Sequence, residues 1–204
     1  MTEVALQPEH AGAPSAAPGA RPDFQIVPLK GLPIVAAVFV ALVVAIAANR
    51  YWPLEFLHVV FGSGWTIIDL FLGLVLGPVI GRMSIPARVE LTTRLMPKLL
   101  LIMPTVVTVT LAAGWQLGHL LGTIDSSHPM HGWIVASYVV VGCMAVIALG
   151  LLEPANVAVL FELKKPHPNP AVIERLMKRF LYTAGVTGVM QVATFVIMTK
   201  VAAA

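Results

Sequence analysis

The stretch Phe56–Ile80, FLHVVFGSGWTIIDLFLGLVLGPVI, decides the fold of this chain. This stretch contains one carboxylate, Asp69, and no Lys or Arg. A helix needs about 17–25 mainly apolar residues to cross the hydrocarbon core of a bilayer. Because lipid offers no partner to backbone N–H and C=O groups, a spanning segment is either a helix or part of a closed barrel. An unbroken apolar run without period-two alternation selects the helix. This stretch is therefore predicted to be a transmembrane helix.

Four further apolar stretches repeat this pattern along the chain, at about 32–48, 99–121, 133–152 and 180–199. The first is near the lower length limit, and the one at 133–152 continues past Pro154 and is expected to project beyond the bilayer. The chain is 58% hydrophobic and 11% charged, against about 45–50% and about 25% in soluble domains. This difference excludes a water-soluble globule. The predicted fold is all-α: a polytopic integral membrane bundle of five transmembrane helices.

The beginning of the chain has a different composition from the remainder. Residues 1–30 are rich in Ala and Pro and contain no long apolar run, so we expect a disordered cytoplasmic tail. Residues 31–204 form the predicted transmembrane domain. The single cysteine, Cys143, excludes an internal disulfide and a Cys-rich metal site.

Lys and Arg are distributed very unevenly over the predicted loops. Of the 13 Lys and Arg residues, only Arg50 and Lys200 lie on one side of the predicted bundle. The others gather before the first span, after the second and after the fourth. Cytoplasmic loops carry the excess of positive charge, so the N-terminus is predicted to be cytoplasmic and the C-terminus outside, in the inner (plasma) membrane. Topology explains the basic loops, and no nucleic-acid partner is expected.

Small and polar residues recur every three or four positions on several predicted spans. Gly73, Gly77 and Gly81 form one stripe of small residues, and Gly114, Gly118 and Gly122 form another. Such stripes let helix backbones approach closely, here within the chain or, alternatively, between two copies.

Polar stripes indicate which faces turn inward, because polar groups avoid lipid. The expected stripes are His58–Gly62–Trp65–Asp69, Thr105–Thr108–Ala112–Trp115–His119 and Thr183–Thr187–Gln191–Thr194–Met198. The first span has no such stripe. It is therefore expected to be a peripheral helix beside a four-helix core.

Four of the six histidines gather at the predicted outer face. His58 and His119 lie about one turn inside the outer ends of the second and third spans, while His128 and His131 flank Met130 on the following loop. Imidazoles on facing helices can hold a haem, and imidazole with thioether suits copper. We expect His58 and His119 to bind a cofactor, with His131 as a third candidate ligand. The alternative is that these are interfacial histidines without a cofactor.

Asp69 lies within the second predicted span. A charge at this depth costs about 2.5–3.5 kcal/mol on insertion scales, so such residues are usually functional or paired. One hypothesis is a proton relay below His58. The other is a protonated or hydrogen-bonded carboxyl that fixes helix contacts with a Thr or Gln on a neighbouring helix.

The chain contains no nucleophile elbow, P-loop, dinucleotide fingerprint or HExxH motif. Sequence motifs therefore do not decide whether this chain is an enzyme.

A scattered pattern over roughly Glu55–Lys200 resembles a known family. Leu57-His58 is followed by Gly62, Gly64 and Trp65, then by a basic loop and by Pro104 and Thr108 before Gly114. Arg175 to Arg179 then lead into Phe195-Val196-Ile197-Met198-Thr199-Lys200. This pattern resembles bacterial predicted integral membrane proteins described only as a domain of unknown function. It resembles, more distantly, the CopD-type copper-resistance proteins and the HemJ-type protoporphyrinogen oxidases.

The resemblance implies a four-helix core in which His58 corresponds to the haem- or metal-associated histidine. The HemJ-type pattern also has a lysine where this chain reads Gly132-Trp133-Ile134-Val135-Ala136, a departure that argues against the oxidase activity. The expected function is a redox-accessory protein or membrane-complex subunit with a haem site. The alternatives are a haem-dependent membrane oxidoreductase and a copper-handling protein or transporter. The expected partners are the lipid bilayer and either other subunits of a membrane complex or further copies of the chain.

Overall fold

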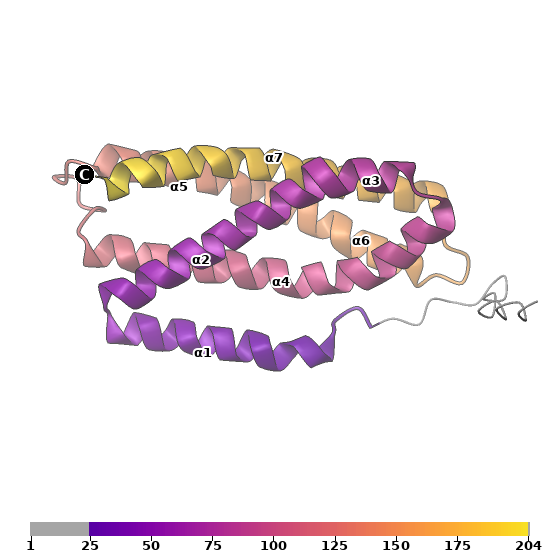
Figure 1. Ribbon diagram of the computed structural model, residues 1–204, viewed down its shortest axis with the longest axis horizontal. Coiled ribbons are helices and arrows are strands. Elements are labelled where there is room, and N and C mark those ends of the chain that lie inside the picture. The colour runs from indigo at the N-terminus through magenta and orange to yellow at the C-terminus, as the bar shows by residue number, and fades with distance from the viewer. Residues whose placement is uncertain (1–24, 204) are drawn as a thin grey trace, which may run out of the picture.

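A computed structural model describes residues 25–203, and all regular secondary structure in this range is helical (Figure 1). The helices follow one another as long antiparallel rods joined by short connections. A 3₁₀ turn at Leu29–Gly31 precedes the first rod. The elements are α1 (Leu32–Ala48), α2 (Tyr51–Leu70), η2 (Phe71–Leu76), α3 (Gly77–Arg82), α4 (Ile85–Leu120), α5 (His131–Ile147), η3 (Ala148–Leu152), α6 (Glu153–Leu163) and α7 (Pro170–Ala202).

Within residues 25–203, five rods are long and apolar enough to cross a membrane. They are Leu29–Ala48, Tyr51–Arg82, Ile85–Leu120, His131–Leu163 and Pro170–Ala202. The predicted all-α fold with five membrane-crossing helices is confirmed. Of the predicted tail at residues 1–30, residues 1–24 lie outside the described residues. Its last two residues belong to the 3₁₀ turn Leu29–Gly31, and Ile26 packs against the main core, so residues 26–30 are not the disordered segment that was predicted.

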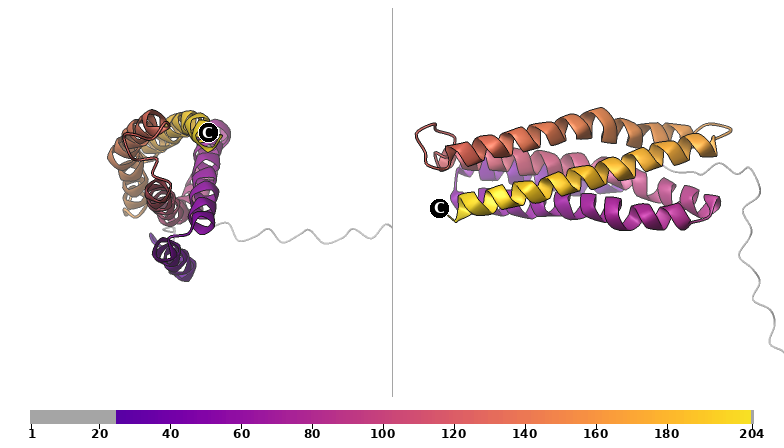
Figure 2. Two further views of the ribbon diagram at one scale, coloured as in Figure 1. Left: turned by 90° about the vertical axis from the view of Figure 1, so that its left-hand side faces the viewer. Right: turned by 90° about the horizontal axis from the view of Figure 1, so that it is seen from above.

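Helix α1 stands apart from the other four rods, as predicted. Seen along the bundle, the other rods form a ring and α1 lies outside it (Figure 2). It packs mainly against α4 and α2. Only Leu42 and Ala45 of α1 are buried, against Leu54 and Leu57 of α2 and several residues of α4. An apolar helix without a polar face loses nothing by facing lipid on its remaining sides.

The second and fourth rods each contain a π-helical segment, η2 and η3. Each segment ends immediately before a helix with proline in its first turn, Pro78 in α3 and Pro154 in α6. Proline lacks the N–H for the bond to residue i−4, and its ring crowds that carbonyl. The wider π turn accommodates both effects without interrupting the rod.

Most of the basic residues after the second and fourth spans belong to helices rather than to loops, the exceptions being Lys164 and Lys165 between α6 and α7. Helix α4 begins at Ile85 and α7 begins at Pro170, well before the apolar runs expected at 99 and 180. Pro86 in the first turn favours the start of α4. Asn169 caps α7, because its side-chain oxygen accepts a hydrogen bond from the N–H of Ala171 at 3.0 Å. Hydropathy marks only the lipid-immersed part of each helix, so these amphipathic ends were missed.

The two ends of the bundle differ in composition. We call the end with the α3–α4 turn (83–84) and the α6–α7 loop (164–169) the basic end. The distal end carries the α1–α2 turn (49–50), the α4–α5 loop (121–130) and the end of α7. In Figure 1 the basic end is on the right and the distal end on the left. The main buried core, which includes Met96, Leu160 and Phe180, joins α4, α6 and α7.

Candidate cofactor cavity

The bundle contains a cavity of about 670 Å³ between α2, α4, α5 and α7. Tyr51, Thr123 and Ala202 place its mouth at the distal end. Trp65, Met144 and Gln191 form its inner part, toward the middle of the bundle. The walls are mostly apolar, and the polar side chains among them include Glu55, His58, Thr66, Thr110, Ser137 and Gln191. A large apolar cavity with a few convergent polar groups is the usual form of a small-molecule site.

His58 lies on α2, and the Nδ1 and Cε1 side of its ring lies against α4. Its Nδ1 lies 2.9 Å from the backbone oxygen of Thr110. Because a carbonyl oxygen can only accept, Nδ1 carries the proton in this contact. In the neutral imidazole, Nε2 then has a free lone pair. His58 lines the cavity, and the backbone bond fixes both its tautomer and its ring orientation.

The space for this imidazole comes from Gly114. A Cβ atom at position 114 would stand 2.4 Å from Nδ1 of His58 and 2.5 Å from Cε1. No side chain fits there while the ring keeps its place. The second glycine stripe therefore serves partly to admit the His58 side chain, and Gly118 of the same stripe packs against Ile124.

His128, on the α4–α5 loop, also lines the cavity. Its Nδ1 accepts a hydrogen bond from the N–H of Met130 at 3.1 Å, so the neutral ring carries its proton on Nε2. His128 thus presents a donor where His58 presents a lone pair.

The same loop is organised by Asp125. Its Oδ1 accepts hydrogen bonds from the N–H and the hydroxyl of Ser127, both at 3.0 Å. These bonds hold the pKa of Asp125 below its ordinary value, the backbone bond being the larger cause.

The structure does not bring His119 to His58. The side chain of His119 is exposed and packs edge-on against Trp115, with ring centroids 5.0 Å apart. His58 instead contacts α4 at Thr110 and Gly114. Gly114 and His119 are five residues apart, which is about 140° around a helix of 3.6 residues per turn.

The inward face of α4 also differs from the predicted stripe. Thr108 and His119 of that stripe are exposed and do not line the cavity, whereas Thr110, Gly114 and Leu117 do. Trp115 of the stripe is half exposed and also lines the cavity. Thr110 tolerates this position because its hydroxyl donates to the backbone oxygen of Val106 at 2.7 Å. Because a threonine can bond to its own helix, its place in the sequence does not indicate whether it faces the interior of the bundle or the lipid.

His131 begins α5, and its Nδ1 is buried without a hydrogen-bond partner. It does not line the cavity. Within residues 25–203, no group of three or more His, Cys, Asp or Glu side chains is arranged to hold a metal ion.

Asp69 lies just beyond the inner part of the cavity and is 1% exposed. Its Oδ2 accepts hydrogen bonds at 2.9 Å from three groups: the indole N–H of Trp65, the hydroxyl of Thr187 and the amide of Gln191. Two of these partners, Trp65 and Gln191, also line the cavity. The carboxyl therefore connects α2 to α7, through the Thr and Gln that the second hypothesis for Asp69 required. Its Oδ1 and the Oε1 of Gln191 have no partner within the described residues.

The polar face of α2 is the part of the site that the sequence predicted best. His58, Gly62 and Trp65 line the cavity in the expected order, with Asp69 next. Glu55, one turn before His58 and also in the lining, was missed, although its spacing of three residues from His58 places it on the same face.

Comparison with protein-family models, with curated proteins and with solved structures finds no match for this chain.

Proposed function

We propose that this chain is a redox-accessory subunit of a bacterial membrane complex that binds haem in the cavity through Nε2 of His58. The observation that carries the proposal is the hydrogen bond from Nδ1 of His58 to the Thr110 carbonyl. A metal-ligating histidine almost always donates its other ring N–H to a carbonyl or carboxylate, which fixes the tautomer and raises the basicity of the ligating nitrogen. Such an imidazole has the tautomer and orientation that ligation requires before the cofactor binds.

The cavity favours haem over a bare metal ion. A porphyrin supplies the equatorial ligands itself, so one imidazole can hold it, whereas a copper or zinc site needs several side chains together. The described residues offer no such group of three. The volume of about 670 Å³ lies within the range of cofactor pockets, about 300–1,000 Å³. When bound, haem would supply one-electron redox chemistry.

The other polar residues of the site would control protons and orientation. Glu55 places a carboxylate near the mouth of the cavity. The unpaired Oδ1 of Asp69 is the atom that would accept a proton below the inner part. His128 would donate from Nε2 at the mouth. Trp65 and Gln191 hold the Asp69 carboxyl in place. Because both residues also line the cavity, a change in the charge of Asp69 would change the electrostatic potential inside it.

The proposal includes an orientation. The basic end would lie in the cytoplasm and the distal end, with the mouth of the cavity, outside the plasma membrane, because Lys and Arg are retained on the cytoplasmic side. The resemblance to CopD-type and HemJ-type proteins belongs to the same proposal, since it also assigns the cofactor to His58.

The test is the absorption spectrum of the full chain purified in detergent from cells supplied with haem precursor. The wild type should show a Soret band, and His58→Ala should lose it while keeping its helical circular dichroism. The matched controls are His119→Ala and His128→Ala, which remove histidines at the same end of the bundle. Both should keep the band, because His119 lies outside the cavity lining and His128 presents a donor.

Two results would overturn the proposal. One is a wild-type protein without a Soret band even after haem is added to it. If elemental analysis then finds bound copper, the copper-handling alternative takes its place. The other is a His58→Ala protein with the wild-type spectrum. A Soret band that responds to a substrate added without any partner protein would instead identify the chain as an oxidoreductase in its own right.

A further inference from the structure

A second recess, separate from the cofactor cavity, lies at the basic end. It measures about 360 Å³ and is formed by α3, the first turns of α4 and the first turns of α7. Its walls are mostly apolar, with Ile80, Ile85, Val89, Ile173, Met177 and Leu181 among them. No residue lines both this recess and the cofactor cavity.

Two glycines keep the recess open on the α3 side. A Cβ atom at Gly81 would meet no atom within 4 Å, and one at Gly77 would make only ordinary contacts, with the Leu72 carbonyl at 3.4 Å and the Leu181 side chain at 3.7 Å. Gly81 was predicted to be part of a helix-packing stripe, but no helix among residues 25–203 covers it. Along α7, the recess continues from Glu174 to Leu181, about 10 Å at 1.5 Å per residue. It is therefore an apolar groove that begins at charged residues.

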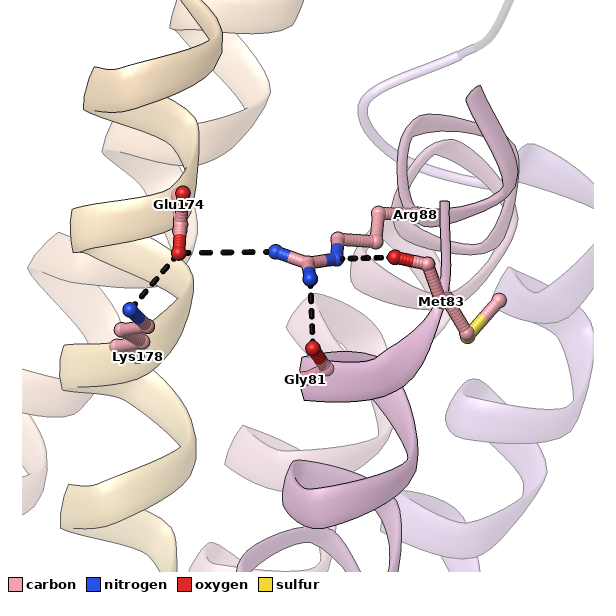
Figure 3. Close-up of polar contacts among 5 residues, drawn as sticks. All are labelled: Gly81, Met83, Arg88, Glu174 and Lys178. Atoms are coloured by element: carbon pink, nitrogen blue, oxygen red, sulfur yellow. Dashed lines mark hydrogen bonds and ion pairs between the residues drawn. The ribbon is translucent and has the colours of Figure 1, made fainter. Parts of the chain in front are cut away.

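Three charged side chains line this groove where it begins (Figure 3). Nε of Arg88 donates to the Met83 carbonyl at 2.9 Å, and Nη2 donates to the Gly81 carbonyl at 2.7 Å. Oε1 of Glu174 lies 3.7 Å from Nη1 of Arg88 and 2.8 Å from Nζ of Lys178. Two cations thus share one carboxylate oxygen, so the cluster has a net positive charge.

The surroundings add to this positive charge. Arg82 on α3 and Arg175 and Arg179 on α7 are exposed at the same end. The two backbone bonds hold the Arg88 guanidinium in place, whereas the side chain of Lys178 is 72% exposed and is paired with Glu174 at the surface. The recess combines a fixed cation, an exposed cation and an apolar groove that leads toward the middle of the membrane-crossing helices.

We propose that this recess binds one anionic phospholipid. The phosphodiester group lies against Arg88 and Lys178, and one acyl chain follows the groove over Gly81 and Gly77 toward Leu181. Basic pockets between membrane helices at the cytoplasmic side recognise anionic headgroups. The positive surroundings favour an anionic over a zwitterionic headgroup. A second copy of the chain fits less well, because a parallel copy would bring its own basic end against this one.

The experiment is native mass spectrometry of the full chain, released from detergent after incubation with phosphatidylglycerol or with phosphatidylcholine of the same acyl chains. The wild type should retain one phosphatidylglycerol under activation that removes phosphatidylcholine. Lys178→Gln should lose that adduct through the headgroup contact. Gly81→Leu should lose it because the leucine side chain fills the groove. Arg88 is left unchanged, because it also joins α3 to α4.

The control variants make the same chemical changes elsewhere. Lys200→Gln removes a cation at the distal end, and Gly150→Leu adds a side chain at another glycine whose Cβ would meet no atom within 4 Å. Both should keep the adduct. If Gly81→Leu does not fold, the exposed Lys178→Gln decides the matter.

Three results would overturn the proposal: equal retention of the two lipids, retention of phosphatidylglycerol by Lys178→Gln, and disulfide cross-linking of two chains through Gly81→Cys. The last result would show that a second copy covers the groove. None of these measurements depends on haem, so they leave the proposed function of the cofactor cavity untouched.

Discussion

At the scale of single residues, the contact between His58 and Gly114 links the proposed ligand to a missing side chain on the facing helix. The imidazole reaches the Thr110 carbonyl only because α4 has no Cβ at position 114. Glycine in the middle of a helix costs roughly 0.5–1 kcal/mol relative to alanine. At position 114 the glycine is needed because the His58 side chain of α2 occupies the space that a Cβ would fill.

Gly114→Ala is therefore expected to displace the His58 ring and to abolish haem retention while the helices remain. The added Cβ would lie 2.4 Å from Nδ1, so the hydrogen bond to Thr110 cannot keep its geometry. Absorption spectroscopy measures the loss, and circular dichroism checks the helical content. Gly142→Ala, where the new Cβ meets no atom within 4 Å, is the control. Wild-type haem content in Gly114→Ala would contradict the assignment of His58.

Asp69 offers a second prediction at this scale, which separates its structural role from its acid–base role. Asp69→Ala leaves the buried donors of Trp65 and Gln191 without their acceptor, and each such loss costs about 1–3 kcal/mol. Asp69→Asn can place its amide oxygen where Oδ2 now accepts, and its NH₂ where Oδ1 has no partner. We expect denaturant unfolding in mixed micelles to show a large loss of stability for Asp69→Ala and a much smaller loss for Asp69→Asn.

The proton-relay hypothesis predicts a second effect of Asp69→Asn. This variant should keep the Soret band but lose part of the pH dependence of the haem midpoint potential, because the amide does not titrate. Redox titration at several pH values measures this effect. An unchanged pH dependence would leave Asp69 with its structural role alone.

At the scale of the elements, η2 and α7 approach each other closely at a pair of glycines, Gly73 and Gly185. A Cβ at Gly73 would stand 2.2 Å from the Cα of Gly185 and 2.6 Å from its backbone nitrogen. Both obstructing atoms belong to the backbone, so no side-chain movement can relieve the clash. The π segment and the glycine pair therefore bring two backbones into direct contact, which is the usual role of small residues in membrane helices.

Gly73→Ala should accordingly destabilise the bundle, by about 1–3 kcal/mol, the usual cost of overpacking. Gly64→Ala on α2 makes the same change where no atom lies within 4 Å, and it should be neutral or slightly stabilising because alanine is the better helix former. Unfolding of both variants in mixed micelles, followed by circular dichroism, compares them directly. Equal stabilities would mean that the rods do not approach each other as closely as described.

At the scale of the whole molecule, the two ends of the bundle carry different charges and different sites. The basic end holds the recess proposed to bind a lipid, and the distal end holds the mouth of the candidate cofactor cavity. If the basic end is cytoplasmic, the groove meets the anionic inner leaflet and the cavity opens to the outside. The orientation of the chain therefore decides which compartment each site contacts.

Reporter fusions test this orientation. A reporter that is active only outside the cytoplasm should give a signal when fused after Thr123, in the α4–α5 loop, and none when fused after Pro168, in the α6–α7 loop. A cytoplasmic reporter at the same positions should give the opposite pattern and serves as the control. Signals in the reverse order would mean that the positive-inside rule fails for this chain.

The sequence by itself determined the fold class, the number of membrane-crossing helices within the described residues and the peripheral place of α1. The physical reason is local: lipid requires every backbone group to bond within its own helix, so apolar length alone identifies a spanning helix. It also determined the inward face of α2, because Trp65 and Asp69 cannot face lipid without loss. It missed the helical starts at Ile85 and Pro170, where hydropathy falls but the helix continues.

Only the tertiary structure decided how α4 is rotated about its axis and which groups meet across the bundle. A threonine can bond to its own helix, and a histidine can lie at the membrane interface, so Thr108 and His119 did not fix a direction. The rotation follows instead from where a side chain of one helix finds a space on another, as His58 does at Gly114. Complementarity of this kind belongs to pairs of surfaces, and neither helix specifies it in its own sequence.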